Sequence, residues 1–120
     1  MATIFVFVIL TPEATAKPDR RCVKVAVVHS AQFYAKKLGW RPIDVLNSYR
    51  INLWQKPTSA GKGRIVGKML VGSHAEIIKE LSDDYLVKSP MDNSIGYVNR
   101  MHFSGTVYQD KYTYKTCTPK

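Results

Sequence analysis

Histidines, cysteines and carboxylates are the side chains of this sequence that could carry catalysis or hold a metal ion. The histidines His29, His74 and His102 share no HxxxH spacing and have no cysteine or carboxylate arranged beside them as a ligand set. No serine sits in a nucleophile elbow, and the segment 61–63 (GKG) lacks the frame of a phosphate-binding loop. We therefore expect a protein that is not an enzyme and that has no metal site and no cofactor.

Aromatic and basic side chains offer a chemistry of binding instead. Aromatic rings provide stacking or proline-docking surface, and cations beside them can bind a carboxylate or another anionic group. The predicted ligand-binding residues are Trp54, Lys56, Lys62, Arg64, Tyr85 and Tyr97. The alternative is that the three rings belong to the core of the fold, and the sequence leaves this open.

The charge of the chain is strongly positive. Its 18 lysines and arginines outnumber 9 acidic residues, which gives a formal net charge of +9. Such a surface attracts polyanions: nucleic acid, anionic lipid or the anionic polymers of a bacterial envelope. The basic residues are scattered, without a run of five or six, so a surface that merely keeps the protein soluble is the alternative interpretation.

The first residues, 1–16, are predicted to be a signal peptide. The run 4–10 (IFVFVIL) is apolar, and 14–16 (ATA) supplies the small residues that a signal peptidase reads. No Lys or Arg precedes the run, and a β-strand is the alternative because Ile, Phe and Val favour strands. No segment approaches the ~20 apolar residues of a membrane span. We expect a periplasmic or secreted protein.

The two cysteines, Cys22 and Cys117, agree with export. They lie far apart, without the spacing of a zinc site, and in an oxidising compartment they could pair. A cross-link that closes so long a loop contributes at most roughly 4–5 kcal/mol in the chain-entropy model. The alternative is two unrelated buried thiols.

Upstream of residue 51 the pattern indicates one strand and one helix. The segment 22–28 (CVKVAVV) is rich in β-branched residues, as strands are. Ser30 is a candidate N-cap and Gly39 a candidate C-terminal stop, with apolar residues at helical spacing between them. A helix is therefore expected over 31–38, and 43–46 could add one further turn.

From residue 51 the apolar pattern changes to a period of two, which is typical of strands. Gly67 lies inside one strand and indicates a bulge or a close approach. Short strands at such close spacing indicate a small antiparallel barrel, which leaves few open edges. The expected strands are 51–54, 65–71, 75–81, 85–89 and 95–98, followed by a single helical turn at 99–101 and a further strand at 107–117.

The order of these elements is similar to that of the bacterial SH3 (SH3b) domain family over residues 51–103. The segment 51–59 (INLWQKPTS) resembles the family's opening strand, and 64–81 (RIVGKMLVGSHAEIIKEL) resembles its central hairpin. The segment 83–103 (DDYLVKSPMDNSIGYVNRMHF) resembles the closing hairpin with its one-turn helix. The resemblance implies a small SH3-like antiparallel barrel and a targeting module, usually non-catalytic, directed at peptidoglycan or its cross-bridge peptides.

The fold class expected is therefore mainly β: an SH3-like barrel at 51–104, a strand-helix extension at 17–50 and a C-terminal strand or tail at 105–120. The function expected is an exported binding module for peptidoglycan or for an envelope protein or peptide. The alternative is a basic, SH3-like nucleic-acid-binding protein of the cytoplasm. A third hypothesis is an interaction protein that docks on a partner through the strand-helix extension. The sequence predicts no oligomeric state.

Overall fold

The computed structural model describes residues 21–119. The chain forms two compact units. We call the first the terminal clasp, described at 21–23 and 108–119, and the second the core unit, residues 24–107. The predicted signal peptide, 1–16, lies outside the described residues.

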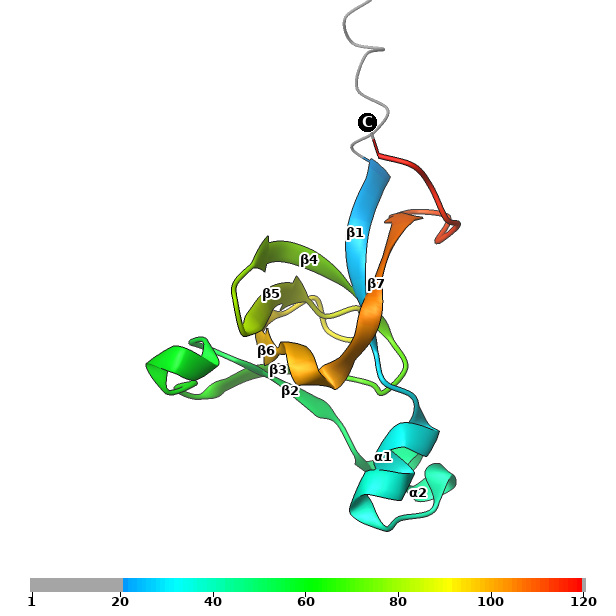
Figure 1. Ribbon diagram of the computed structural model, residues 1–120, viewed down its shortest axis with the longest axis vertical. Coiled ribbons are helices and arrows are strands. Elements are labelled where there is room, and N and C mark those ends of the chain that lie inside the picture. Colours follow the sequence, from blue (N-terminus) through cyan, green and yellow to red (C-terminus); the bar gives the residue numbers. More distant parts are fainter. Residues whose placement is uncertain (1–20, 120) are drawn as a thin grey trace, which may run out of the picture. The chain divides into compact units, whose positions relative to one another are not determined.

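The protein is mainly β, as expected (Figure 1). In the described part of the chain, seven strands form one sheet in the order β3-β2-β6-β5-β4-β1-β7. The strands are β1 (Cys22–Val28), β2 (Ile51–Trp54), β3 (Ile65–Met69), β4 (His74–Glu80), β5 (Asp84–Lys88), β6 (Ile95–Asn99) and β7 (Phe103–Asp110). This order is open: it begins at β3 and ends at β7, so strand pairing within 21–119 does not close the sheet into a barrel.

Two short helices, α1 (Ala31–Leu38) and α2 (Pro42–Ser48), follow β1 and precede β2 along the chain. They lie beside each other (Figure 1). The side chain of Ser30 accepts a hydrogen bond from the backbone N–H of Phe33, which caps the start of α1. Gly39 ends α1 in the left-handed conformation at φ 74°, which costs a residue without a Cβ little. The expected helix over 31–38 is confirmed.

The expected strands are found with small shifts at their ends. The single helical turn expected at 99–101 is found one residue later, as the 3-10 turn η5 (Arg100–His102). The final strand, β7, ends at Asp110 rather than at the expected 117, and it begins at Phe103, earlier than the expected 107. Its first residues, 103–106 (FSGT), include Ser and Gly, which are poor strand formers, but β1 lies beside β7 and provides the pairing.

The core of the core unit lies on one face of the sheet. Its least exposed large side chains include Leu53, Met69 and Val87, each 0% exposed. Helix α1 adds Tyr34, which is 2% exposed, to the same cluster. Burial of this kind is the main term that offsets the entropy of ordering the chain.

The edge strand β3 is covered by the loop between β5 and β6. The Oγ of Ser89 donates to the carbonyl of Lys68 at 2.7 Å, and the Lys68 N–H donates to the Oδ2 of Asp92 at 3.4 Å. A Cβ at position 67 would collide with the side chain of Ser94, so this approach requires Gly67. The register of β2 and β3 also shifts beside this glycine. The close approach and the bulge expected there are both confirmed.

The terminal clasp is held by the Cys22–Cys117 disulfide, whose Cα atoms lie 5.8 Å apart. Beside it, the Oδ1 of Asp110 accepts the backbone N–H groups of Tyr112 and Thr113 and so forms a tight turn. These hydrogen bonds, and then the nearby Arg21, hold the pKa of Asp110 below its usual range. The pairing of the two cysteines is therefore as expected. Of the helices within 21–119, none has the length and apolar character needed to cross a membrane.

Candidate binding site

Three half-buried side chains form a row on the outer face of the sheet, which we call the outer strip: Trp54, Tyr97 and Leu86. Leu53 points into the core, so its neighbour Trp54 points to the opposite face. Trp54 lies directly opposite Tyr97 on β6, which in turn lies opposite Leu86 on β5. Directly opposed residues share a face, so these side chains make one apolar surface across β2, β6 and β5.

A cation lies over the tryptophan of this strip. The Nζ of Lys62 is 5.1 Å from the centre of the Trp54 ring, within the range of a cation–π interaction. The loop 55–64 brings it there by turning back on itself, because Lys62 takes a left-handed conformation at φ 65° between two glycines that do the same. The carbonyl of Lys62 then accepts the backbone N–H of Lys56 at 2.9 Å.

The buried carboxylate of Asp84 fixes this loop to the sheet. Its Oδ2 accepts hydrogen bonds from the backbone N–H of Thr58 at 3.1 Å and from the Thr58 hydroxyl at 3.2 Å. Thr58 begins the 3-10 turn η4 (Thr58–Ala60). Asp84 is only 3% exposed, so these bonds form away from bulk water, where losing them is costly.

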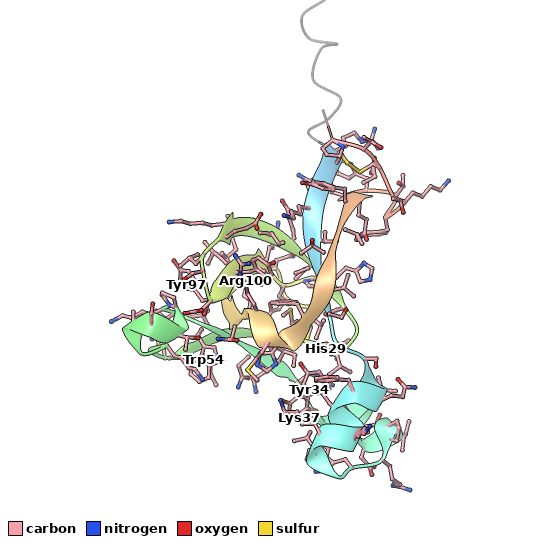
Figure 2. The ribbon with its side chains drawn as sticks, viewed as in Figure 1. His29, Tyr34, Lys37, Trp54, Tyr97 and Arg100 are labelled. Atoms are coloured by element: carbon pink, nitrogen blue, oxygen red, sulfur yellow. A yellow bond between two sulfur atoms is a disulfide. The ribbon has the colours of Figure 1, made fainter. Side chains whose placement is uncertain are left out.

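A second group of aromatic residues, the helix cluster, surrounds the start of α1: His29, Phe33, Tyr34, Tyr49 and His102. Figure 2 labels two of them, His29 and Tyr34. The rings of His29 and Phe33 stack with centroids 3.7 Å apart. The Tyr34 hydroxyl lies 2.8 Å from Nδ1 of His102. The Nζ of Lys37 lies 5.9 Å from the centre of the Phe33 ring, so this cluster also carries a cation over a ring.

Two opposite pKa shifts set the protonation states of Tyr34 and His102. Burial, and then the neighbouring Tyr49, raises the pKa of Tyr34. Burial, and then the charges of Lys37, Lys62 and His29, lowers the pKa of His102. At neutral pH Tyr34 is therefore protonated and the His102 imidazole is neutral, and the hydroxyl and Nδ1 share a hydrogen bond. Tyr34 is 2% exposed, so the pair holds α1 against η5 and does not reach a ligand.

Lys62 belongs to the loop beside the outer strip and Lys37 to α1, yet after burial the charges of both lower the pKa of His102.

The structure brings three of the predicted ligand-binding residues together: Trp54, Lys62 and Tyr97. Lys56 and Arg64 are exposed and lie on the same loop, where the Arg64 carbonyl accepts the N–H of Gln55. Tyr85, the sixth of them, lies apart from this group.

Tyr85 lies in the buried core. It is 9% exposed, and its ring packs against Phe103 at 5.5 Å. The guanidinium of Arg100 covers it at 4.3 Å, and the same side chain donates to the carbonyl of Leu81. The core alternative thus describes Tyr85 better than a ligand contact does.

Sequence reasoning missed the contribution of α1 to the helix cluster. His29, Phe33 and Lys37 recur at intervals of four residues, which places them in one stripe along the start of the helix. That spacing, next to the N-cap at Ser30, was the signal available. The proximity of the stripe to His102 depends on the fold and has no local signal.

The hairpin of α1 and α2 also exposes large apolar side chains. They are Phe33 (39%), Leu38 (39%), Trp40 (43%), Ile43 (52%) and Leu46 (49%). The hypothesis of docking through the strand-helix extension stays a prediction, and these side chains are the ones that it would use.

Among residues 21–119, no three His, Cys, Asp or Glu side chains are grouped so that they could hold a metal ion. Comparison of the chain with protein-family models, with curated proteins and with solved structures found no match. The similarity to bacterial SH3 domains therefore stays a prediction from the motifs of residues 51–103.

Proposed function

We propose that the protein is a non-catalytic binding module that recognises peptidoglycan or an anionic peptide of a bacterial envelope. The observation that carries the proposal is the Lys62 ammonium 5.1 Å from the Trp54 ring, beside Tyr97 on the outer strip. The rings give apolar contact area, and the cation gives an attractive partner for a carboxylate. Together they can hold a ligand without any group that transfers a proton or forms a bond.

The fold that we propose for this module is a modified SH3-like barrel. The consecutive antiparallel strands β4, β5 and β6, followed by the one-turn η5, support it, because the family resemblance implies a closing hairpin that leads into a single helical turn. The loop that covers β3 also supports it, since it shields an edge that a closed barrel would pair.

The compartment that we propose is the periplasm or the cell exterior. The Cys22–Cys117 disulfide supports this location, because such bonds persist in oxidising compartments and are rare in the cytosol. Mass spectrometry of the exported chain, with and without reductant, tests both the oxidised pair and cleavage near Ala16. Free thiols in the native protein would contradict the location.

Cosedimentation with purified peptidoglycan sacculi tests the binding function. We expect the wild-type protein to sediment with the sacculi, and Trp54→Ala and Lys62→Ala to reduce the bound fraction severalfold. Trp40→Ala and Lys36→Ala are the matched controls, because both residues are exposed on or next to α1 and lie outside the outer strip. Wild-type protein that stays in solution, or equal losses in variants and controls, would refute the proposal.

Nucleic-acid binding is the second candidate, and the two cation–ring pairs favour it. Bases stack on aromatic rings such as Trp54 and Phe33, and lysines beside them contact phosphates. Binding to a fluorescent single-stranded oligonucleotide that weakens steeply with salt would support it. An oligonucleotide that stays unbound at low salt would remove this candidate.

A further inference from the structure

The outer strip continues beyond its three residues at both ends. Trp54 lies directly opposite Ile65 of β3, and Leu86 lies directly opposite Lys79 of β4. Directly opposed residues share a face of the sheet, so both additions face outward with the strip. We call the five together the outer row, in spatial order: Ile65, Trp54, Tyr97, Leu86 and Lys79. It crosses five neighbouring strands, β3-β2-β6-β5-β4, and Figure 2 labels its two rings, Trp54 and Tyr97.

We propose that the outer row binds an extended acidic peptide that lies across the strands. One carboxylate of the peptide contacts Lys62, a second contacts Lys79, and an apolar side chain between them covers the middle of the row. This inference rests on the proposed binding function and specifies its ligand. It also adds Lys79, on β4, to the residues of the site.

The lysines at the two ends of the apolar surface supply the charge complementarity. The Nζ of Lys62 lies 5.1 Å from the centre of the Trp54 ring, and Lys79 follows Leu86 in the row. Both lysines are exposed. The ion pairs within 21–119 engage other cations, namely Arg21, Lys24 and Arg41. A ligand carboxylate at either lysine would therefore not have to displace one of these carboxylates.

The two flanks of the row are different. On one flank Asp84 lies opposite Asn99, and Thr58 of the loop 55–64 bonds to both side chains. The loop therefore covers that neighbouring row and borders a ligand on this side. On the other flank Lys88 lies opposite Glu76, so the outward carboxylate there faces a lysine of the protein. The row itself contains cations and apolar side chains and no acidic residue.

The strand spacing predicts the spacing of the two ligand carboxylates. From Trp54 to Lys79 the row makes three steps between neighbouring strands. Each step is about 4.8 Å, so these two positions lie roughly 14 Å apart along the sheet. An extended peptide advances about 3.4 Å per residue, so acidic residues about four positions apart span the same distance. Alternate residues of such a peptide point to one side, so both acids and the residue midway between them face the row. The recognised pattern is acid-x-apolar-x-acid.

The position of Lys62 favours a carboxylate over a stacked ring as the contact at this end. Its ammonium lies over the Trp54 ring, so a sugar or a base that stacked on that face would have to displace it. A carboxylate can bind the exposed ammonium without moving it. The middle of the row, Tyr97 and Leu86, then gives contact area to an apolar side chain.

An NMR titration of the isotope-labelled protein with the pentapeptide Glu-Ser-Leu-Ser-Glu, blocked at both ends, tests the proposal. We expect the largest amide shifts at the five positions of the outer row. The isomer Glu-Ser-Leu-Glu-Ser has the same composition and charge, but its second acid points away from the sheet. It should bind at least about threefold more weakly, as loss of one exposed charge contact implies. Equal affinity for the two peptides would overturn the proposal.

Single lysine variants test the two ends separately. Lys62→Ala and Lys79→Ala should each weaken binding of Glu-Ser-Leu-Ser-Glu about three- to fivefold. Lys36→Ala is the matched control, because it removes the same charge from an exposed residue of α1, outside the row. It should change the affinity less than about twofold. A Lys79→Ala variant that behaves like Lys36→Ala would refute the row.

Reversal of one charge gives a readout that a folding defect would not mimic. Lys79→Glu should bind Glu-Ser-Leu-Ser-Glu more weakly than Lys79→Ala does, because a carboxylate then faces a carboxylate. It should prefer peptides in which one glutamate is replaced by lysine, tested with the lysine at either end because the peptide can run in two directions. The wild type should show the opposite preference. The same preference in both proteins would contradict the contact at Lys79.

Three further outcomes separate this inference from the proposed function. If Trp54→Ala and Lys62→Ala reduce binding to sacculi while Lys79→Ala affects neither sacculi nor peptide, the row is wrong and the outer strip stands. If the wild type binds neither the peptide nor sacculi, both proposals fail. If oligothymidine binds more tightly than the peptide, the acidic-peptide assignment is wrong.

Discussion

The terminal clasp and the core unit are each stabilised internally by a different kind of interaction. The core unit buries Leu53, Met69 and Val87 completely, whereas Tyr112 and Tyr114 of the clasp are 64% and 72% exposed. The clasp depends on a covalent bond, on the turn around Asp110 and on the guanidinium of Arg21, which lies 5.0 Å from the Tyr112 ring. We therefore expect the stability of the clasp to depend on redox conditions. The stability of the core unit, and of the candidate site on it, should depend on packing.

Leu53→Ala should have the largest effect and tests the packing side of the comparison. Leu53 is 0% exposed, so its truncation should lower the free energy of unfolding by about 3–4 kcal/mol. Denaturant unfolding measures this loss. Ile43→Ala, at a site 52% exposed, is the control and should change stability by less than about 1 kcal/mol. A similar loss at both positions would mean that the core is not where the structure places it.

Removal of the disulfide tests the covalent side. The double variant Cys22→Ser, Cys117→Ser should lose about 2–4 kcal/mol, because its unfolded chain is no longer cross-linked. Reductant should impose the same loss on the wild type and none on the variant, as thermal and denaturant unfolding can show. Binding to sacculi below the unfolding transition should survive, since the outer strip belongs to the core unit. Loss of binding in the folded variant would break the comparison.

Asp84→Ala tests how the core unit holds its binding loop. The change removes the oxygen that accepts both Thr58 hydrogen bonds and should cost about 1–3 kcal/mol. Amide hydrogen exchange across 57–63 should become faster, and Asp84→Asn, which keeps an acceptor oxygen, should cost less. Asp83→Ala is the control, because its side chain is exposed on the neighbouring position. Unchanged exchange in Asp84→Ala would show that the loop is anchored by other contacts.

Acidification should have the smallest of these effects, and it should act on the core unit at His102. The pKa of His102 is lowered in the folded state, so the unfolded chain binds the proton more tightly. The free energy of unfolding should therefore fall as the pH drops below the ordinary histidine value of about 6.5 toward the lowered pKa. His102→Gln should flatten this dependence in denaturant unfolding at pH 5–8. A dependence as steep in the variant as in the wild type would assign it to other groups.

The elements that the sequence predicted well are those with local signals. Ser30 and Gly39 set both ends of α1, because a hydroxyl cap and a left-handed glycine act within a few residues of the chain. The strand at Ile51–Trp54 was predicted with its correct ends. Gly67 within a strand predicted a close approach, which the Ser94 side chain makes. The outer position of Trp54 and Tyr97 follows from the same alternation.

The features that the sequence could not give depend on contacts distant in the chain. Asp84 comes just before the expected strand 85–89, and it is buried because the loop at Thr58 folds over it. The charges of Lys37 on α1 and of Lys62 on loop 55–64 both lower the pKa of His102 on η5, and no local sequence pattern indicates this. The open strand order is of the same kind, since close spacing of strands favours a barrel but does not specify which edges pair.

The covered edge at Lys68 has a consequence for how molecules of this protein meet one another. An extended segment of another chain extends a sheet by bonding to free peptide groups along its border, but at Lys68 both of these groups are already engaged. Hydrogen bonds from Ser94 keep the pKa of Asp92 below its usual range, so the Asp92 carboxylate stays charged in mildly acidic surroundings. Addition of a strand from another molecule to β3 at Lys68 is thereby opposed.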